Sequence, residues 1–385
     1  MKVLQVHSKY KKRGGEETVV EEEKVVLENH GHTVVQYIRD NAETDDYGAM
    51  RLIKLSLTQR RNKIAVNEVA TLLAREKPDI CHVHNVYPLI SPAVYEACQL
   101  QGVPVVQTLH NYKMLCTNSL LFREGNVCEL CLNKSLLNSV KYSCYKHSLL
   151  ATAVQADAIQ YHRRKGTWQH MVDAYVCLTE FQKNKMIQGG MPAEKLRIKP
   201  NFVHKTNLSS TYENFFLFVG RLDESKGLAD LLKLIDTCVD SRFVLIGDSE
   251  NPQVFSRLQH VNYLGPQSRD IVLDYMSRCK AVIFPSRYYE GMPMVILEAF
   301  SLKKGVIARN VGAMSSMIRH GVNGLSYEDT NGLIKAVKEL DGHLELVRKV
   351  GEGAFDNFEN IYSVEQGYQN LISLYNSVLD EKHGV

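Results

Sequence analysis

Two cations in the second half of the chain have a position suited to binding a diphosphate. Arg221 and Lys226 follow an apolar run at residues 215–219, which the pattern predicts to be a buried strand, and they precede a predicted helix. The loop therefore places both cations at the carboxyl end of a strand, beside the free N–H groups of a helix start. Fixed positive charge there can stabilise negative charge that grows on a leaving diphosphate. The alternative is a solvated turn with incidental charges.

Two glutamates flank another turn of the same kind. The apolar run at 281–284 predicts a buried parallel strand, and Glu290, a Gly-Met-Pro-Met turn and Glu298 follow it. Pro293 suits a first helical turn, so Glu290 should lie just before the helix and Glu298 within it. Open α/β sheets bind ligands at the carboxyl edge of their strands, which makes this turn a candidate site. The alternative is two solvated glutamates on one helix.

The first half carries glycines and histidines at comparable positions. Gly14 and Gly15 stand at the entrance of the first predicted helix, where backbone can approach a ligand and N–H groups favour an anion. They lack the spacing of the dinucleotide fingerprint, so a nicotinamide cofactor is not predicted. His82, His84 and His110 lie near the ends of predicted strands, on the ligand side of the sheet. A plain tight turn and structural histidines are the alternatives.

The elements that would position these residues alternate between strand and helix. This order predicts an α/β protein with parallel, doubly wound, Rossmann-like sheets. Because a single core stops growing at about 250 to 300 residues, a chain of 385 residues should form two domains. A Ser-, Thr- and Asn-rich stretch at 205–214 predicts the linker between a domain of residues 1–204 and a second of residues 205–363.

Together the two loop motifs resemble those of the retaining glycosyltransferases of family 4. The pair Glu290 and Glu298 around Gly-Met-Pro resembles the family signature, and Arg221 and Lys226 stand in the Gly-Arg and Lys-Gly pairs of its second motif. The resemblance implies that Glu290 contacts the transferred sugar, that Glu298 holds the ribose hydroxyls, and that the cations bind the donor phosphates. This sequence departs from the family pattern after Val311, where serines replace an acidic residue.

The resemblance also implies an architecture and an assignment of sites. It is the glycosyltransferase B fold, with two Rossmann-like domains facing across a cleft and a C-terminal helix at 364–385 that returns to the first domain. His110, which ends the strand Thr-Leu-His-Asn, would face the sugar and act with Glu290 as a catalytic residue. The residues assigned to the donor are Gly14, Gly15, Arg221, Lys226, Gly291, Met292, Pro293, Met294 and Glu298.

The implied function is transfer of a hexose, with retention of configuration, from a UDP- or GDP-sugar to a glycan or lipid-linked saccharide. Surface polysaccharide biosynthesis is the expected setting. No Asp-x-Asp suited to Mg²⁺ stands out, so no catalytic metal is expected. The alternatives are a sugar-nucleotide epimerase or hydrolase of the same fold, and a non-catalytic zinc-containing binding protein. The sugar, the base, the acceptor and the oligomeric state do not follow from the sequence.

Four cysteines have spacing typical of a structural metal site. They are Cys116, Cys128, Cys131 and Cys144, separated by eleven, two and twelve residues. Four thiolates form a closed tetrahedral zinc site, which would have no open position for catalysis. Zinc would then stabilise an insert at 116–144 beside His110, a feature of a subgroup of the family. A redox dithiol and four free thiols are the alternatives.

Composition and charge limit the partners. A formal charge of +3 does not by itself imply nucleic acid, and none is expected. The N-terminus has no signal-peptide pattern and no run approaches 18 apolar residues, so a cytoplasmic protein is expected. Basic residues at 51–63 alternate with leucines and isoleucine, which suits either peripheral contact with an anionic membrane or a solvated helix face. The basic run at 163–165 either extends that surface or forms a loop.

Overall fold

A computed structural model describes residues 1–11, 14–255 and 257–383 of the chain, and it contains two compact units. The first unit comprises Met1–Leu121, Cys128–Pro200 and Tyr368–Val385, and the second comprises Phe122–Val127 and Asn201–Gly367. The main change from one unit to the other therefore falls between Pro200 and Asn201, shortly before the stretch predicted as a linker. Each unit has its own sheet and its own core.

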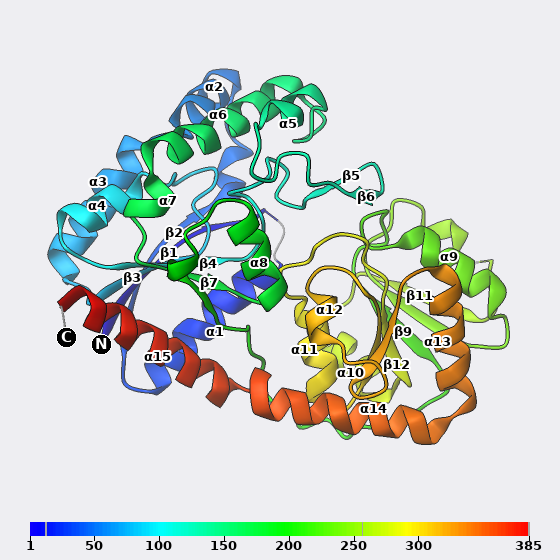
Figure 1. Cartoon of the computed structure of the whole chain (residues 1–385). Coiled ribbons are helices and arrows are strands. Elements are labelled where there is room, and N and C mark those ends of the chain that lie inside the picture. The colour runs from blue at the N-terminus through cyan, green and yellow to red at the C-terminus, as the bar shows by residue number, and fades with distance from the viewer. Residues whose placement is uncertain (12–13, 256, 384–385) are drawn as a thin grey trace. The chain divides into compact units, whose positions relative to one another are not determined.

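The first unit is built on a parallel sheet of six strands in the order β2-β1-β3-β4-β7-β8 (Figure 1). The order reverses beside β1, as in a doubly wound fold. Its strands are β1 Lys2–Lys9, β2 Thr33–Asp40, β3 Ile80–Val83, β4 Val105–Leu109, β7 Ala174–Cys177 and β8 Leu196–Ile198. β3, β4 and β7 are buried throughout, because helices cover both faces of a parallel sheet.

The second unit repeats this plan in the order β11-β10-β9-β12-β13-β14. Its strands are β9 Phe216–Val219, β10 Phe243–Ile246, β11 Val261–Gly265, β12 Ala281–Phe284, β13 Gly305–Arg309 and β14 Gly324–Tyr327. The predicted strands at 215–219 and 281–284 are thus present, and β9 and β12 are neighbours through the pair Leu217 and Val282. The α/β class with two Rossmann-like sheets is confirmed.

Helices connect the parallel strands in both units. Those of the first unit are α1 Gly15–Asn29, α2 Ala49–Thr58, α3 Lys63–Glu76, α4 Val94–Leu100, α5 Leu137–Lys141, α6 Leu149–Lys165, α7 Thr167–His170 and α8 Glu180–Gln188. Those of the second unit are α9 Leu228–Thr237, α10 Arg269–Arg278, α11 Met294–Ser301, α12 Met314–Met317, α13 Thr330–Gly342 and α14 Leu344–Asn357. A short antiparallel pair, β5 Phe122–Arg123 and β6 Asn126–Val127, lies within the predicted cysteine insert.

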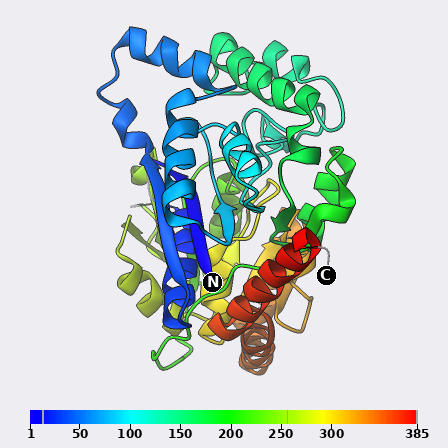
Figure 2. The ribbon, with the colours of Figure 1, turned by 90° about the vertical axis from the view of Figure 1, so that its left-hand side faces the viewer.

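The last helix, α15 Val364–His383, begins in the second unit and packs against the first from Tyr368 onward. Tyr375 is fully buried, and its hydroxyl lies 2.7 Å from His82 Nδ1 on β3. The Tyr368 ring stacks on His30 at a centroid distance of 3.6 Å. Figure 2 shows this helix, in red, lying along the side of the first unit close to the N-terminal strand. The C-terminal segment is therefore part of the core of the first unit.

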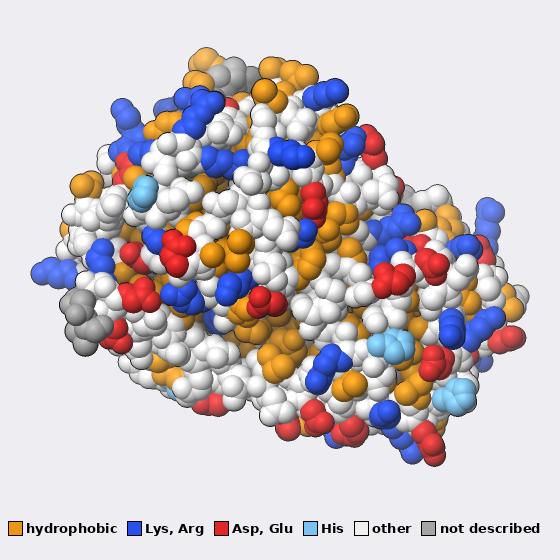
Figure 3. Space-filling view, viewed as in Figure 1, with side chains coloured by type: hydrophobic (Ala, Val, Ile, Leu, Met, Phe, Trp, Pro, Cys, Tyr) orange, Lys and Arg blue, Asp and Glu red, His pale blue; other side chains and the backbone are white. Residues whose placement is uncertain are grey.

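At one end of the first unit, α2 and α6 lie side by side in both ribbon views (Figures 1 and 2). Arg60, just after α2, donates to Asp157 on α6 at 2.6 Å through Nε. Apolar side chains stand out from this end, and Figure 3 shows them mixed with basic ones along the upper edge. The exposed ones are Met50, Leu57, Leu137, Tyr142, Leu149 and Leu150. In the described part of the chain, every helix is too short or too polar to cross a bilayer.

Candidate functional site

Two loops at the carboxyl edge of the second sheet are joined to each other. Because β9 and β12 are neighbours, the loop after each strand emerges at the same edge. The N–H of Arg287 donates to the carbonyl of Ser225 at 2.9 Å, and the Ser286 hydroxyl donates to the same carbonyl at 3.4 Å. The motif around Lys226 and the motif around Glu290 thus form one structure, although 64 residues separate them.

Glu290 is held by three donors. Its Oε1 lies 2.6 Å from the ammonium of Lys226 and 2.8 Å from the Ser286 hydroxyl, and its Oε2 accepts from the Tyr288 hydroxyl at 2.7 Å. The carboxylate is 8% exposed. Burial and the adjacent Glu290 carboxylate raise the pKa of Tyr288 well above its usual value, so this phenol stays a donor. A carboxylate fixed in this way keeps a defined orientation toward whatever binds at the edge.

The two predicted phosphate-binding cations differ in their surroundings. Lys226 is partly buried and its ammonium lies 5.3 Å from the ring centroids of both Phe284 and Tyr288. Arg221 is exposed, and its Nε lies 3.3 Å from Asp223. Lys226 is therefore preorganised by the site, whereas Arg221 remains accessible to an anion. Both follow β9, as predicted.

α11 begins at Met294 after Pro293, which gives the predicted order of Glu290 before the helix and Glu298 within it. Because α11 follows β12, its start lies at the carboxyl edge of the sheet, and it has no side-chain cap there. Glu298 pairs with Arg269 at 3.1 Å, and burial raises its pKa while Arg269 opposes that effect. Met292 is almost fully buried, and its sulfur accepts the N–H of Asn201 at 3.2 Å. Gly291 lies between Glu290 and Met292, in the turn that precedes the helix.

A glycine lets the loop after β13 pack closely against the Glu290 turn. Gly312 has a φ of +62°. A Cβ at this position would lie 2.9 Å from Tyr289 Cα and 3.4 Å from the Glu290 nitrogen. A larger residue would therefore displace the Glu290 turn, so Gly312 preserves the geometry of the site.

In the first unit the sheet register brings four histidines together. Val6 pairs with Val83 and Val83 with Gln107, so His7 within β1 lies near His84 and His110, which follow β3 and β4. His82 and His84 share a face of β3, since side chains alternate along a strand. The rings of His84 and His110 stack at 5.3 Å between centroids, and those of His82 and His84 lie 4.3 Å apart. Sequence reasoning selected His82, His84 and His110, and it did not select His7.

The contacts of His84 favour one tautomer of each ring. His84 Nδ1 lies 3.0 Å from His110 Nε2, and His84 Nε2 lies 3.5 Å from Glu23 Oε2, a close approach without a hydrogen bond. Burial, together with neighbouring positive groups, lowers the pKa of both His84 and His110 well below its usual value, which favours neutral rings. The nearby carboxylate favours the proton on His84 Nε2, and in that tautomer Nδ1 accepts from His110 Nε2–H. In the matching tautomer His110 presents an unprotonated Nδ1.

Glu23 and Lys199 form a buried ion pair behind these histidines. Lys199 Nζ lies 2.5 Å from Glu23 Oε1, and the two side chains are 2% and 0% exposed. Neither residue was predicted to matter. A signal for Glu23 exists, because it is a charged residue on the buried face of α1 among Val19, Val20 and Val26. Lys199 gives no such signal, because only the fold brings it to α1.

The same carboxylate belongs to a group that could hold a metal ion. Glu23, His82 and His84 offer potential ligand atoms that lie within 4.8 Å of one another. His82 is already engaged, since its Nδ1 faces the Tyr375 hydroxyl and its Nε2 faces Thr108 Oγ1 at 2.8 Å. A cation here would also face the ammonium of Lys199, so the electrostatics favour the ion pair over a metal.

Gly14 and Gly15 begin α1 as predicted, but Glu17 already uses one of the N–H groups. Glu17 Oε2 accepts the N–H of Gly14 at 2.8 Å, and Oε1 accepts the N–H of Tyr10 at the same distance. Burial raises the pKa of Glu17, but the hydrogen bonds from His7, Tyr10 and Gly14 outweigh it and lower the pKa to about 2. A phosphate at this helix start would meet a carboxylate, which weakens the predicted role of Gly14.

A lysine that was not predicted lies beside His110. Lys113 and His110 both line a small cavity of about 30 Å³. The ammonium of Lys113 donates to the Thr117 carbonyl at 3.0 Å and lies 4.8 Å from the centroid of the Tyr145 ring. Burial lowers the pKa of Lys113 to about 7. At neutral pH this amine is therefore present in both protonation states beside the candidate catalytic histidine.

The four cysteines lie near one another without converging. Burial and the nearby thiols of Cys116, Cys144 and Cys128 raise the pKa of Cys131 to about 11. Within the described residues, however, the potential ligand atoms that gather within 4.8 Å are those of Glu23, His82 and His84, not these sulfurs. Zinc bonds of about 2.3 Å would require closer thiols, so the structure does not support the predicted zinc site.

The two basic segments, residues 51–63 and 163–165, include residues that form ion pairs or belong to a helix. Arg60 pairs with Asp157 and Arg61 with Glu96, so two cations of residues 51–63 connect the segment after α2 to α6 and α4. The run at 163–165 is not a loop, because it forms the last turn of α6. These contacts leave Arg51, Lys54 and Lys63 as the cations of the first segment that could face a membrane.

Family comparisons agree with the geometry of the two units. The model described as Glycosyltransferase Family 4 matches residues 13–206, and the one described as Glycosyl transferases group 1 matches residues 213–341. The uncharacterized glycosyltransferase MJ1178 of Methanocaldococcus jannaschii is 31% identical over 54% of this chain and 60% of its own length. An uncharacterized 42.6 kDa protein in the cps region of Klebsiella pneumoniae is 24% identical over 83% of this chain and 88% of its own.

An O-antigen chain mannosyltransferase C of Escherichia coli is 27% identical over 44% of this chain and 48% of its own length. The fold is that of solved glycosyltransferase B structures. Anabaena Alr3699/HepE in complex with UDP superposes with a TM-score of 0.67 at 18% identity, covering 98% of this chain and all of that one. Sucrose-phosphate synthase from Thermosynechococcus elongatus gives a TM-score of 0.73 at 15% identity, covering 99% of each chain.

Proposed function

The chain belongs to glycosyltransferase family 4, and on that premise we propose that it is a retaining hexosyltransferase that uses a UDP- or GDP-sugar. Its acceptor is a glycan or lipid-linked saccharide in surface polysaccharide biosynthesis. The E. coli relative, named for O-antigen chains, supports this setting, and a UDP complex of a similar fold supports the donor class. The proposal includes a cytoplasmic location, at the inner face of the membrane when the acceptor is lipid-linked.

The observation that carries the proposal is the Lys226–Glu290 pair at the carboxyl edge of the second sheet. The 2.6 Å contact brings a cation and a carboxylate to one point, with a helix start beside them. A nucleotide sugar needs this combination, since its diphosphate requires positive charge and its sugar hydroxyls require an acceptor. An exposed ion pair of incidental charges would not be expected to have two further donors on the same carboxylate.

In the proposed reaction the glycosidic C–O bond to the diphosphate breaks and a new C–O bond forms to the acceptor hydroxyl on the same face. The leaving phosphate oxygen takes the bonding electron pair, and it then accepts the proton of that hydroxyl. Lys226 and Arg221 stabilise the charge on the leaving group, and Glu290 orients the sugar. The neutral His110, which presents Nδ1, hydrogen-bonds the substrate without adding charge.

The test begins with donor binding. Thermal unfolding is measured with UDP, GDP, ADP and their sugar conjugates, since a ligand at about 100 times its dissociation constant adds about 2.7 kcal/mol. One nucleotide series should raise the midpoint. With that donor, the radiolabelled sugar should be transferred to an extract that contains glycan or lipid-linked acceptors. Without the extract, no transfer should be measured. Release or epimerisation of the sugar without acceptor would favour the epimerase or hydrolase alternative, and absence of any shift would defeat the proposal.

Variants separate catalysis from binding. Glu290→Gln should lower transfer by about 10²-fold or more while the fold is kept, since the amide cannot replace the carboxylate in orienting the sugar. The matched control is Glu352→Gln, because Glu352 pairs with Lys303 on the surface at 2.9 Å, and it should leave transfer unchanged. Equal activity of the two variants would remove Glu290 from the mechanism and would favour a binding protein.

For the four cysteines, a structural zinc remains part of the proposal. Their spacing, with Cys128 and Cys131 separated by two residues, supports it. Metal content of the purified protein should be near one zinc per chain. Cys128→Ser should lower it, whereas Glu23→Gln should not. Retention of metal in Cys128→Ser and loss in Glu23→Gln would place the ion at the buried histidines, and absence of metal in the parent protein would reject the zinc.

A further inference from the structure

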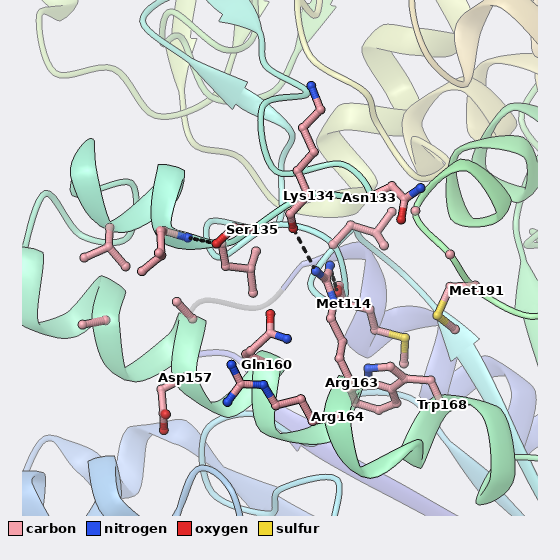
Figure 4. A pocket seen from close by; sticks show the side chains of 18 of the residues that line it. Met114, Asn133, Lys134, Ser135, Asp157, Gln160, Arg163, Arg164, Trp168 and Met191 are labelled. Carbon is pink, nitrogen blue, oxygen red and sulfur yellow. Dashed lines mark hydrogen bonds between the residues drawn. The ribbon is translucent and has the colours of Figure 1, made fainter.

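The first unit contains a large pocket that the proposed chemistry does not use. Its volume is about 810 Å³, within the range of about 300 to 1,000 Å³ of small-molecule sites. Residues from the loop after β4, the cysteine insert, α6, α7 and the turn after α8 line it, and it is partly open to solvent. Figure 4 shows the side chains that surround this space.

Much of the wall is apolar. Residues that contribute apolar side chains to it come from five separate segments, and they include Met114, Leu136, Val140, Ala156, Trp168 and Met191. Leu137 also lines the pocket and is 74% exposed, so the apolar lining continues outward to the surface. Exposed Leu149 and Leu150 lie at the start of α6, which forms part of the same wall. A hydrocarbon chain suits such a surface, because burying it removes apolar area from water.

One end of the pocket carries positive charge that no carboxylate neutralises in the described structure. Arg163 is half-buried and donates to the carbonyls of Met114 at 2.9 Å and Lys134 at 3.5 Å. Burial lowers the pKa of Arg163. The one acidic residue of the wall, Asp157, is already paired with Arg60. Arg164 adds a second, exposed guanidinium from the same helix.

An unused donor lies next to Arg163. The indole N–H of Trp168 has no hydrogen-bond partner among the described residues, although the side chain is only 2% exposed. Figure 4 shows the Trp168 ring and Met114 beside the Arg163 side chain. Because a buried N–H without a partner is costly, this donor indicates that an acceptor group belongs at this end of the pocket.

We propose that the pocket binds a lipid phosphate, with its hydrocarbon chain along the apolar wall and its phosphate at Arg163, Arg164 and the Trp168 N–H. Met114 and Trp168 also line the small cavity that contains His110 and Lys113, so the anionic end lies next to the candidate catalytic histidine. If the proposed transferase function holds, this ligand is the lipid end of the acceptor. The identification as acceptor rests on that function, whereas the lipid phosphate site does not.

Trp168 also provides the measurement, since it is the single tryptophan of the chain. Decyl phosphate, kept below its micellar concentration, should change tryptophan emission with saturation. Decyl glucoside, which has the chain without the charge, should bind at least about tenfold more weakly, and inorganic phosphate should give no change. Equal binding of inorganic phosphate would show a free-anion site, and equal binding of decyl glucoside would show a neutral apolar site; either result overturns the proposal.

Variants place the ligand. Arg163→Gln should weaken decyl phosphate by about tenfold or more, whereas Arg163→Lys, which keeps the charge, should stay within about threefold. Ala153→Phe should fill the pocket and weaken both decyl compounds. Lys335→Glu, on exposed α13 surface outside the pocket, is the control and should change nothing. Unchanged binding in both Arg163→Gln and Ala153→Phe would locate the ligand elsewhere and overturn the proposal.

Thermal unfolding with the nucleotide donor is recorded on each variant as a check of folding. It also separates the two proposals. A donor shift without any decyl phosphate signal rejects the lipid site and leaves the transferase standing. A saturable decyl phosphate signal without any donor shift rejects the transferase and leaves a lipid phosphate site whose ligand is not an acceptor.

Discussion

The ammonium of Lys226 lies 2.6 Å from Oε1 of Glu290, so the cation proposed to bind phosphate is already paired with the carboxylate proposed to orient the sugar. The Ser286 hydroxyl donates to the same oxygen, and the Tyr288 hydroxyl donates to Oε2. A bound diphosphate would share Lys226 with Glu290. The two anions would then compete for one ammonium, which has a measurable consequence.

Glu290→Gln should bind the nucleoside diphosphate as tightly as the parent protein or more tightly, although transfer is lost. The amide removes a negative charge next to the phosphate position, and it can still accept from Lys226. Lys226→Met should instead weaken the nucleotide. Calorimetric titration of both variants with the same nucleotide checks this, and weaker binding to Glu290→Gln would show that the carboxylate does not face the phosphates.

The buried pair Glu23 and Lys199 predicts a double-variant result. Glu23→Gln leaves the Lys199 ammonium buried without a counter-charge and should lower the free energy of unfolding by about 3 to 5 kcal/mol. Adding Lys199→Met removes that uncompensated charge and should recover part of the loss. Urea unfolding of the two single variants and the double variant measures the coupling. Strictly additive losses would mean that the pair does not interact as its 2.5 Å contact indicates.

Acid should destabilise the protein from about pH 6.5 downward. Burial lowers the pKa of His82 to about 4, so the folded imidazole stays neutral while the unfolded one, near 6.5, takes up a proton. The contribution of neutral His82 to the free energy of unfolding is fully present above pH 6.5. It is lost as the pH falls toward 4, at up to about 1.4 kcal/mol per pH unit. In urea unfolding between pH 7 and 4, His82→Asn should show a shallower slope, and His343→Asn, on the surface, should keep the parent slope.

Lys113 should react as an amine at neutral pH. Because burial lowers its pKa to about 7, roughly half of the side chains carry a free amine there, whereas an ordinary lysine, near 10.4, is almost fully protonated. Competitive acetylation followed by mass spectrometry should give a labelling midpoint for Lys113 near pH 7. Exposed Lys233 is the internal reference. A Lys113 midpoint above about 9 would show that the side chain stays charged.

Local signals in the sequence were sufficient for the position of Glu290 before α11 and for Lys226 after β9. Each depends on one apolar run and one turn, and such signals act over a few residues. The contact between the two residues was not predictable in the same way, because it requires β9 and β12 to be neighbours. The His7, Glu23 and Lys199 contacts were missed for the same reason.

Errors arose where local pattern and tertiary context disagree. The basic run at 163–165 gave no helical signal of its own, yet it completes α6, whose Gly166 end cap has a φ of +69°. The spacing of the cysteines indicated a zinc site, but spacing does not determine whether four sulfurs converge. The sequence left Arg61 open between membrane contact and a solvated helix face, and it did not indicate the partner Glu96 on α4.

The contact between His82 and Tyr375 joins residues 293 positions apart, and it lies in the core of the first unit. During synthesis that core cannot be completed when the N-terminal half leaves the ribosome, because α15, which closes it, is translated after the second sheet. The nascent first unit would carry an uncovered surface beside β3 while the second unit is still being translated. Emergence of α15, not emergence of residue 200, is therefore the event that permits final folding of the first unit.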